Sequence, residues 1–440
     1  MTATFGPGSP PLRGTVHVPG DKSLSHRCVL FSAMAQGTTQ LSGVLDSADV
    51  RSTIDGVCAL GAHVELAPQP DHSLSGTITG WGARGPVASD GVVIDCGNSG
   101  TTARLLMGVV AGWPVTVTLT GDESLSRRPM RRITEPLALM GARFDTAEGD
   151  TLPITVHGSE GLSAIQYTSP VASAQVKTAI LLAGLRATGT TSVTEPALSR
   201  DHTERVLPAF GVAVGADARH CSAHVHGPAV LTSAHHVAVP RDPSSAAFLT
   251  VAALLIPGSE VVLPGVSLNE TRTGFLQVLL RMGARIDVVP WPEAGDERIG
   301  ELVVAGVEGL LGTVVTASEV PSLVDEIPIL ALAATAAASE TRFEGVGELR
   351  VKESDRLAAI VEGLTALGAD VVAEADTLVV RGPATLHGAT LDSLGDHRLA
   401  MTWAVAGLVA DGPVSVERFG AVEVSYPGFA ADVAGLAAGR

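Results

Sequence analysis

The chain has 440 residues, of which 45% are hydrophobic and 3% aromatic, and a formal net charge of −17. This length exceeds what one hydrophobic core usually organises, so two domains of about 200 residues each are expected. The hydrophobic content argues against disorder. The acidic charge disfavours a broad nucleic-acid or anionic membrane surface, because phosphate backbones require clustered Lys and Arg.

Cysteine usage and the N-terminal segment indicate the compartment. The four cysteines are scattered without a C-x-x-C pair, which favours reduced thiols over a disulfide framework or a zinc site. Residues 1–18 lack the basic start and apolar core of a signal peptide, and the most apolar run, 327–338, is too short to span a membrane. There is no H-E-x-x-H motif. We therefore expect a cytoplasmic protein that needs no metal and no cofactor.

Six short polar segments recur at intervals of roughly 70 to 80 residues, and each opens an Ala/Leu-rich helical run. A helix N-terminus presents unpaired N–H groups and a partial positive charge, so it attracts anions. The repeats therefore predict an anion site. The segments are DKSLSHR (21–27), GNSGTTAR (97–104), ASAQVKT (172–178), DPSSAAF (242–248), VDEIP (324–328) and GDHRLA (395–400).

Each repeat predicts the same order of elements along the chain. The first helix is followed by a Gly-centred turn and a β-branched strand, then by a second helix that ends at a glycine and by further strands. This β-α-β-α-β-β unit, used six times, predicts an α/β fold. The expected strands include 38–45, 190–195 and 260–264, and the expected second helices are 49–60, 132–140, 201–210, 271–282 and 354–367.

Six units divide naturally into two lobes of three. Residues 14–18 are typical of a strand detached from the first unit, and they could pair with the C-terminal half. The expected lobes are residues 1–20 with 242–440, and residues 21–241. A hinge is expected near 19–22 and 239–242, with the site in the cleft.

The polar openings differ in the chemistry that they offer. Lys22 and His26 are spaced i,i+4, as are Ser23 and Arg27, so the first helix start either presents two polar pairs or forms a solvated capping turn. The loop 97–104 could cradle a phosphate, since its glycines expose backbone N–H groups. The four arginines of 126–132 favour an anionic partner over a solvated basic turn.

The fifth and sixth openings add carboxylates to the cations. Asp325 and Glu326 are either helix caps or part of an acid/base cluster with Lys352, Glu353 and the other charged residues of 350–356. His397 and Arg398 complete that cluster. Cations with a few carboxylates suit a reaction between two anionic substrates in which a proton moves.

Five motifs in this order resemble those of the 3-phosphoshikimate 1-carboxyvinyltransferase (EPSP synthase) family. They are GDKSLSHR, GNSGTTAR, GDESLSRRPM, RVKESDR and DHRLAM. The resemblance implies an inside-out α/β barrel fold in two lobes. It also implies transfer of the enolpyruvyl group of phosphoenolpyruvate to the 5-hydroxyl of 3-phosphoshikimate, by a monomer without a metal.

The resemblance also implies roles for individual residues. Asp325 would accept the hydroxyl proton, while Glu353 and Lys22 would transfer protons at the methylene carbon. Thr101 and His397 would support the site. The 3-phosphoshikimate ligands would be Lys22, Ser23, Arg27, Ser173, Gln175, Ser199, Asp325 and Lys352. The phosphoenolpyruvate ligands would be Lys22, Asn98, Gly100, Arg128, Gln175, Arg356 and Arg398. Gly100 leaves room beside phosphoenolpyruvate, so inhibition by glyphosate is expected.

Four positions depart from the commonest family pattern, and two other functions stay open. Ala174 replaces a serine, His202 an aromatic hydroxyl, Glu348 an asparagine and Val424 a lysine that can bind phosphoenolpyruvate. One alternative is a UDP-N-acetylglucosamine enolpyruvyl transferase, although residues 121–130 lack the reactive cysteine of that family. The other is a non-catalytic anion-binding paralogue, for which the valine is the hint.

Overall fold

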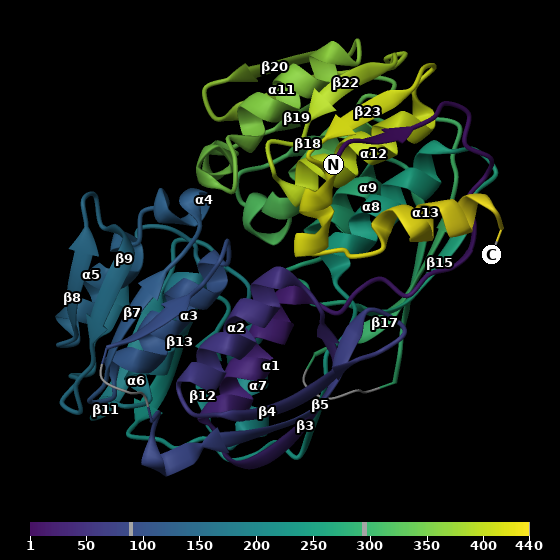
Figure 1. Ribbon diagram of the computed structural model, residues 1–440. Coiled ribbons are helices and arrows are strands. Elements are labelled where there is room, and N and C mark those ends of the chain that lie inside the picture. Colours follow the sequence, from purple (N-terminus) through teal and green to yellow (C-terminus); the bar gives the residue numbers. More distant parts are fainter. Residues whose placement is uncertain (88–90, 293–296, 440) are drawn as a thin grey trace. The chain divides into compact units, whose positions relative to one another are not determined.

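The computed structural model describes residues 1–87, 91–292 and 297–439. The chain folds into two compact units (Figure 1), and each is described by itself. Unit 1 comprises Met1–Pro19 and Pro240–Arg440, and unit 2 comprises Gly20–Val239. The chain thus changes unit at 19/20 and at 239/240, next to the expected crossings at 20/21 and 241/242.

Unit 2 contains three four-stranded mixed sheets among its described residues, with strand orders β14-β3-β5-β4, β6-β7-β9-β8 and β10-β11-β13-β12. In each sheet the first pair is parallel and the other two pairs are antiparallel. The strands are β3 (Gln36–Leu45), β4 (His63–Pro68), β5 (Ser73–Trp81), β6 (Val92–Asp95), β7 (Thr116–Thr120), β8 (Arg143–Ala147), β9 (Thr151–His157), β10 (Gln166–Thr168), β11 (Gly189–Thr194), β12 (Val214–Asp217), β13 (Ser222–Gly227) and β14 (His236–Ala238).

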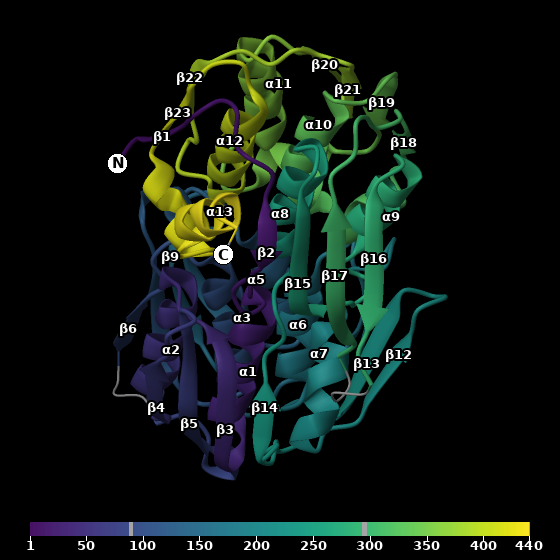
Figure 2. The same ribbon diagram turned by 90° about the vertical axis from the view of Figure 1, so that its right-hand side faces the viewer.

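The helices that follow the polar openings form the interior of unit 2. Helix α3 packs against α1 and α6, and the sheets lie outside them (Figure 2). This inside-out arrangement is possible because these helices are rich in Ala, Gly and Leu and are apolar on nearly every side. The helices are α1 (Lys22–Met34), α2 (Ala48–Ala59), α3 (Gly100–Ala111), α4 (Glu123–Ser126), α5 (Arg131–Leu139), α6 (Ala174–Gly184) and α7 (His202–Val206).

The described residues of unit 1 repeat this plan with two four-stranded sheets and one three-stranded sheet, in the orders β16-β17-β15-β2, β18-β19-β21-β20 and β1-β23-β22. Its strands are β1 (Ala3–Phe5), β2 (Arg13–Thr15), β15 (Glu260–Ser267), β16 (Arg285–Pro290), β17 (Ile299–Ala305), β18 (Val314–Val315), β19 (Glu340–Phe343), β20 (Asp370–Glu374), β21 (Thr377–Arg381), β22 (Ala389–Asp392) and β23 (Val414–Glu417).

Strands distant in sequence complete two of the repeats. Strand β2 pairs in parallel with β15, which confirms that the N-terminal strand joins the C-terminal half. Strand β14, at the end of unit 2, pairs in parallel with β3 at its beginning. The first strand of the first and fourth repeats therefore comes from outside the local segment. The sequence predicted this for the N-terminal strand β2 but not for β14.

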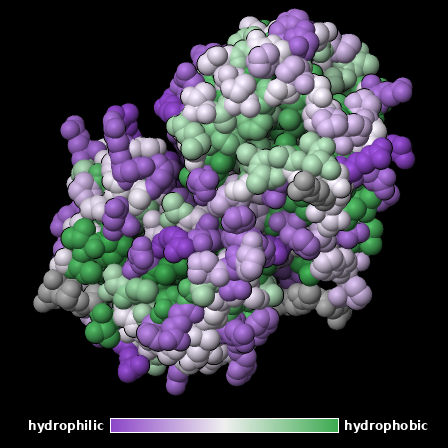
Figure 3. Space-filling view, turned by 45° about the vertical axis from the view of Figure 1, so that its right-hand side comes forward, coloured by the Kyte–Doolittle hydropathy of each residue, from purple (hydrophilic) through white to green (hydrophobic). Residues whose placement is uncertain are grey.

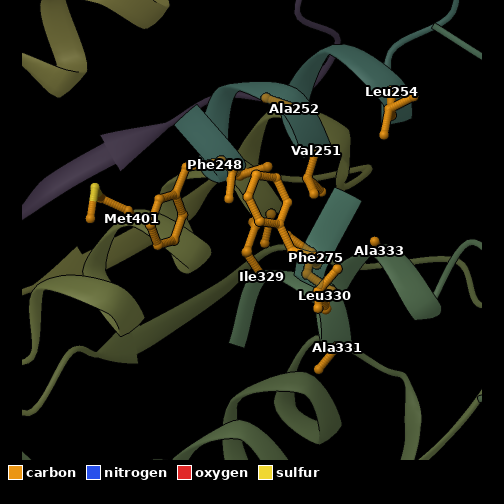
Figure 4. Close-up of a cluster of buried hydrophobic side chains, with 14 of the residues drawn as sticks. Phe248, Val251, Ala252, Leu254, Phe275, Ile329, Leu330, Ala331, Ala333 and Met401 are labelled. Atoms are coloured by element: carbon orange, nitrogen blue, oxygen red, sulfur yellow. The ribbon is translucent and has the colours of Figure 1, made fainter. Parts of the chain in front are cut away.

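Three helices of unit 1 pack against one another and fill its core. Phe248 of α8, Ile329 of α10 and Met401 of α12 point into a common apolar cluster (Figure 4). Every residue of α8 except the last is buried, as its Ala-rich sequence predicts. The helices of unit 1 are α8 (Pro243–Leu255), α9 (Gly274–Arg281), α10 (Ile327–Ala334), α11 (Arg356–Ala366), α12 (His397–Val409) and α13 (Phe429–Ala437).

Two expected helices are shorter in the structure. The segment 201–210 continues beyond α7 as a 3-10 turn, Leu207–Phe210, because Pro208 lacks the N–H that an α-helical bond requires. The segment 271–282 becomes α-helical only at Gly274. Before it, the side chain of Asn269 accepts a hydrogen bond from the N–H of Thr271 and forms a turn instead.

The surface is mixed in character. On the face drawn in Figure 3, hydrophobic residues form patches that are interrupted by hydrophilic ones. Within the described ranges, no helix combines the length and the apolar character needed to cross a membrane.

Candidate active site

The start of α1 holds Lys22 and Ser23 in place through partners from other segments of unit 2. The Lys22 ammonium lies 3.3 Å from the Asp49 carboxylate of α2. The Ser23 hydroxyl accepts a hydrogen bond of 3.3 Å from Arg200, and Asp21 caps the helix by accepting from the N–H of Leu24. A helix start that carries Lys22 and has Arg200 beside it attracts an anion.

Arg27 is buried and rigidly held on the same helix. Its Nε donates to the Thr203 hydroxyl and its Nη2 to the Thr178 hydroxyl, both at 2.9 Å. Its Nη1 donates to the backbone carbonyl of Ser23 at 3.0 Å. The i,i+4 spacing therefore joins Arg27 to the Ser23 backbone.

His26 has a different place from the one that its spacing to Lys22 suggested. Its Nδ1 is 2.7 Å from the Thr53 hydroxyl, and the ring is buried. Burial, followed by the nearby charges of Lys22 and Arg27, lowers the pKa of His26 to about 3. His26 is a neutral residue that joins α1 to α2, and the prediction of a Lys22–His26 polar pair is wrong.

The loop before α3 assembles a second group of polar side chains. Ser99 caps α3 by accepting from the N–H of Thr102, and Gly97 takes a positive φ of 54°. Arg128 donates to the Asn98 side-chain carbonyl at 2.8 Å. The carbonyl of Gln175 accepts from Arg104 at 2.8 Å, and its amide donates to Thr101 at 2.9 Å.

Only part of the arginine-rich stretch 126–132 turns toward this loop. Arg127 and Arg131 form exposed pairs with Glu123 and Glu135, as a solvated turn would. The Arg128 side chain lies against Asn98, and its buried Nε has no hydrogen-bond partner in the described part of the chain. That donor is available to a ligand.

The third opening brings two serines to one buried carboxylate. Ser173 caps α6, and its own N–H donates to the Glu195 carboxylate at 2.7 Å. The Ser199 hydroxyl donates to the other oxygen of Glu195, also at 2.7 Å. Ser199 directly precedes Arg200, so these serines belong to the same neighbourhood as Ser23.

In unit 1 a buried arginine gathers three carboxylates. The guanidinium of Arg356, at the start of α11, is 3.1 Å from Asp325, 2.6 Å from Glu353 and 2.7 Å from Asp396. Burial alone would lower the pKa of Arg356, but the three negative charges raise it above its ordinary value. The arginine stays charged and fixes the two carboxylates that the sequence predicted for acid/base work.

Asp325 and Glu326 lie at the start of α10, and Glu326 occupies its N-cap position. No side-chain capping hydrogen bond is made there, so the two carboxylates do not cap the helix in the usual way. Asp325 faces Arg356 and lies 3.9 Å from Arg398, whereas the buried Glu326 accepts a hydrogen bond from Ser244. The two neighbouring carboxylates thus have different surroundings.

The remaining predicted residues of unit 1 lie around the same arginine cluster. Asp396 caps α12 by accepting from the N–H of Arg398 at 2.9 Å, and His397 is buried at this helix start. Arg398 is 4% exposed, and its Nε and Nη1 atoms lack hydrogen-bond partners among the described residues. Lys352 is half-buried, and within the same ranges its side chain makes no ion pair. Both side chains have donors left for an anion.

Sequence reasoning missed four charged residues that hold the predicted ones. Each lies within or beside a motif or an expected helix. Its partner comes from a distant segment, so the neighbouring sequence could not predict which residue it contacts. They are Asp49, Arg104, Arg200 and Asp396.

Metal-ligating residues do not cluster. The chain has one H-x-H sequence, His224 to His226, whose two imidazoles are exposed on β13. Over residues 1–87, 91–292 and 297–439, no group of three His, Cys, Asp or Glu side chains could hold an ion.

The geometry divides the predicted chemistry between two half-sites. The unit 2 half-site offers cations, hydroxyls and helix starts that suit phosphate groups. The unit 1 half-site offers carboxylates beside arginines, which suit proton transfer to and from an anionic substrate. The chain matches the enolpyruvyl transferase NikO from Streptomyces tendae with a TM-score of 0.76 over 99% of this chain and 97% of the other, at 18% identity. The fold is that of the enolpyruvyl transferases.

Closer relatives define the family. The family model for EPSP synthase (3-phosphoshikimate 1-carboxyvinyltransferase) matches residues 7–433. The EPSP synthase structure from Acinetobacter baumannii is 39% identical, with a TM-score of 0.87 over 98% of this chain and 97% of the other. The 3-phosphoshikimate 1-carboxyvinyltransferase of Halorhodospira halophila is 48% identical over 95% of this chain and 92% of its own. That of Bacillus subtilis is 44% identical over 95% and 96%. The chain belongs to the EPSP synthase family.

Proposed function

We propose that the two half-sites carry out the reaction of this family. The enolpyruvyl group of phosphoenolpyruvate passes to the 5-hydroxyl of 3-phosphoshikimate, and inorganic phosphate leaves. The observation that carries the assignment is the Arg356 cluster, which fixes the Asp325 and Glu353 side chains next to Arg398, an arginine with unused donors. Both carboxylates are thus ready to accept or return protons near a bound anion.

The unit 2 half-site would bind the substrates' negative groups. Lys22, Ser23, Arg27, Ser173 and Ser199 would meet 3-phosphoshikimate, and Arg200 extends this set because it donates to Ser23. Gln175 would contact both substrates. Asn98, Gly100 and Arg128 would meet phosphoenolpyruvate, together with Arg356 and Arg398 of unit 1. Lys352 and Asp325 would complete the binding of 3-phosphoshikimate.

The chemistry balances as addition followed by elimination. A proton from Glu353 or Lys22 reaches the methylene carbon of phosphoenolpyruvate, which leaves C2 electron-poor. The 5-hydroxyl adds to C2 while Asp325 accepts its proton. The tetrahedral intermediate then loses phosphate and returns one methyl proton to the group, Glu353 or Lys22, that supplied it, which restores the vinyl group. The arginines stabilise the charge on the departing phosphate.

Several finer points stay predictions. These are the monomeric state, the cytoplasmic location and the hinge near 19–22 and 239–242. His202 is buried at the start of α7, Glu348 lies in the 3-10 helix Gly347–Val351, and Val424 ends the 3-10 helix Phe419–Val424. We assign no substrate contact to these three residues.

Phosphate release from phosphoenolpyruvate tests the proposal directly. The purified chain should release phosphate with 3-phosphoshikimate and show no release above background with UDP-N-acetylglucosamine. Release only with the sugar nucleotide would identify the other enolpyruvyl transferase activity, and no release with either acceptor would favour a non-catalytic paralogue. Both outcomes contradict the proposal.

The two carboxylates should affect turnover more than binding. Asp325→Ala and Glu353→Ala leave Arg356 paired with Asp396, so the variants should fold. We expect kcat to fall by about 100-fold or more, since general acid/base groups contribute about that factor. The Kd for 3-phosphoshikimate should change little in Glu353→Ala and rise by much less than kcat falls in Asp325→Ala, which removes one of several ligands. Steady-state kinetics and calorimetric titration separate the two quantities. Lost binding with unchanged kcat would refute the assigned roles.

A further inference from the structure

Unit 2 contains a buried charge cluster that the proposed reaction does not use. Lys177 of α6 is 2% exposed, and its ammonium lies 3.0 Å from the carboxylate of Glu195 and 2.8 Å from that of Glu204. Burial alone would lower the pKa of Lys177, but the carboxylates of Glu204 and Glu195 raise it above its ordinary value. The lysine is therefore charged although it faces the interior.

The two carboxylates around Lys177 differ in what else they bind. Glu195, directly after β11, accepts from the Ser173 N–H with Oε1 and from the Ser199 hydroxyl with Oε2, each at 2.7 Å. Glu204 lies in α7, and its buried Oε2 has no hydrogen-bond partner within the described part of the chain. Only Glu195 links the ammonium to the two serines.

We infer that Glu195 is a positioning residue for the part of the site that binds 3-phosphoshikimate. Its carboxylate holds Ser173, the N-cap residue of α6, and the Ser199 side chain in one arrangement. Lys177 offsets its negative charge, which would otherwise repel the substrate phosphate. Glu195 acts through the two serines and need not touch the substrate. The inference rests on the proposed function, which assigns Ser173 and Ser199 to this substrate.

Geometry makes the effect specific to one substrate. The serines of this cluster are assigned only to 3-phosphoshikimate. Phosphoenolpyruvate is assigned to Asn98, Gly100 and Arg128, with which Glu195 makes no hydrogen bond or ion pair in the described part of the chain. Gln175 is assigned to both substrates, but its side chain is held by Arg104 and Thr101 and not by Glu195. If the two serines lose their fixed arrangement, the KM for 3-phosphoshikimate should rise and the KM for phosphoenolpyruvate should stay nearly unchanged. A purely structural carboxylate would alter stability without that selectivity.

The Glu195→Gln variant tests the inference, with Glu204→Gln as the matched control. Both changes are isosteric, and both remove one negative partner of Lys177. We expect Glu195→Gln to raise the KM and the Kd for 3-phosphoshikimate about tenfold. The reason is that the neutral glutamine has only one acceptor oxygen, so either the Ser173 N–H or the Ser199 hydroxyl loses its charged acceptor. The KM for phosphoenolpyruvate and kcat should change less than about twofold. Glu204→Gln should lower thermal stability to a similar extent but keep both KM values near those of the native chain.

A double-mutant cycle with Ser199→Ala measures whether Glu195 acts through that serine. If it does, adding Glu195→Gln to Ser199→Ala should raise the Kd for 3-phosphoshikimate by clearly less than it does in the native background. Full additivity, or equal increases of both KM values in Glu195→Gln and Glu204→Gln, would overturn the inference. Calorimetric titration supplies Kd without turnover.

A second variant keeps the test decisive if Glu195→Gln does not fold. Glu195→Asp retains the charge beside Lys177 but shortens the reach by one methylene, so the carboxylate cannot hold both serines. The same selective rise in the KM for 3-phosphoshikimate is expected, and a non-selective change would contradict the inference. Failure of the native chain to use 3-phosphoshikimate would instead refute the proposed function, so the two failures are distinguishable.

Discussion

At the scale of single residues, the site depends on buried arginines with unused N–H donors and on a glycine that leaves space beside one of them. Arg128 and Arg398 each keep at least one buried N–H group without a partner in the described ranges. Such groups are costly in an empty protein unless a ligand or water meets them. Gly100 contributes in the opposite way, because its lack of a side chain keeps the space beside Arg128 open.

Gly100→Ala should weaken binding of phosphoenolpyruvate without unfolding the chain. A Cβ there would lie 2.6 Å from Nη1 of Arg104 and 3.5 Å from Nη1 of Arg128. The flexible Arg104 can move, but it then strains its bond to Gln175. We expect the KM for phosphoenolpyruvate to rise about tenfold and inhibition by glyphosate to weaken, both measurable by phosphate release.

A second glycine serves as the control for that substitution. An added Cβ on Gly435 in α13 would meet no heavy atom within 4 Å, so Gly435→Ala should leave both KM values unchanged. If Gly100→Ala behaves like Gly435→Ala, the assignment of Gly100 to this substrate is wrong.

At the scale of helices and strands, helix starts carry both structure and chemistry. Asp396 shows the combination, since it caps α12 and also neutralises the buried Arg356. Asp355 caps α11 in the same way but is exposed. The two caps separate the contribution of a capping bond from that of a buried charge.

Removal of Asp396 should cost more stability than removal of Asp355. Asp396→Ala loses a cap and leaves Arg356 with less compensation, so the free energy of unfolding should fall by about 3 kcal/mol or more. Asp355→Ala should lower it by about 1 kcal/mol, which is typical of an N-cap. Urea unfolding compares them, and equal losses would show that the ion pair to Arg356 adds nothing.

His26 makes the contacts among three helices sensitive to pH. Its ring bonds Thr53 of α2, whose hydroxyl is 2.6 Å from that of Thr102 in α3. Because the folded pKa of about 3 lies below the unfolded value of about 6.5, only the unfolded chain binds a proton between these values. Stability from this group is full above pH 6.5 and declines as the pH falls toward 3.

The His26→Asn variant should lose that pH dependence. Between pH 7.5 and pH 5.0 the native chain should lose about 2 kcal/mol more unfolding free energy than the variant. Urea titrations at the two pH values measure the difference. His224→Asn, which changes an exposed histidine of β13, should follow the native chain. Equal slopes for native and His26→Asn proteins would mean that His26 is not buried in the neutral form.

At the scale of the whole molecule, each unit has its own hydrophobic core. The buried cluster of unit 2 runs from Leu24 to Val239, and that of unit 1 joins Leu12, Val16 and Val18 to residues 246–436. Neither cluster draws members from the other unit. Unit 2 is continuous in sequence, whereas unit 1 needs its N-terminal segment for strands β1 and β2.

A fragment of residues 20–239 should therefore fold on its own. We expect a cooperative thermal transition and native-like near-UV circular dichroism, but no turnover, because the carboxylates lie in the other unit. A fragment of residues 240–440 should be much less stable, since β15 and β23 lose their N-terminal partners. A disordered 20–239 fragment would show that its core is insufficient.

The sequence by itself determined the repeat and the class of fold, and it predicted the residues that are proposed to carry the chemistry. Those features depend on local signals, namely helix starts, Gly-terminated helices and charged motifs such as RVKESDR. Only the tertiary structure showed that His26 turns into the core, that Asp325 faces Arg356 without capping a helix, and that Glu195 joins two serines to Lys177. These pairings link residues far apart in the chain. Their partners are chosen by packing and by the cost of burying charge, which no local pattern records.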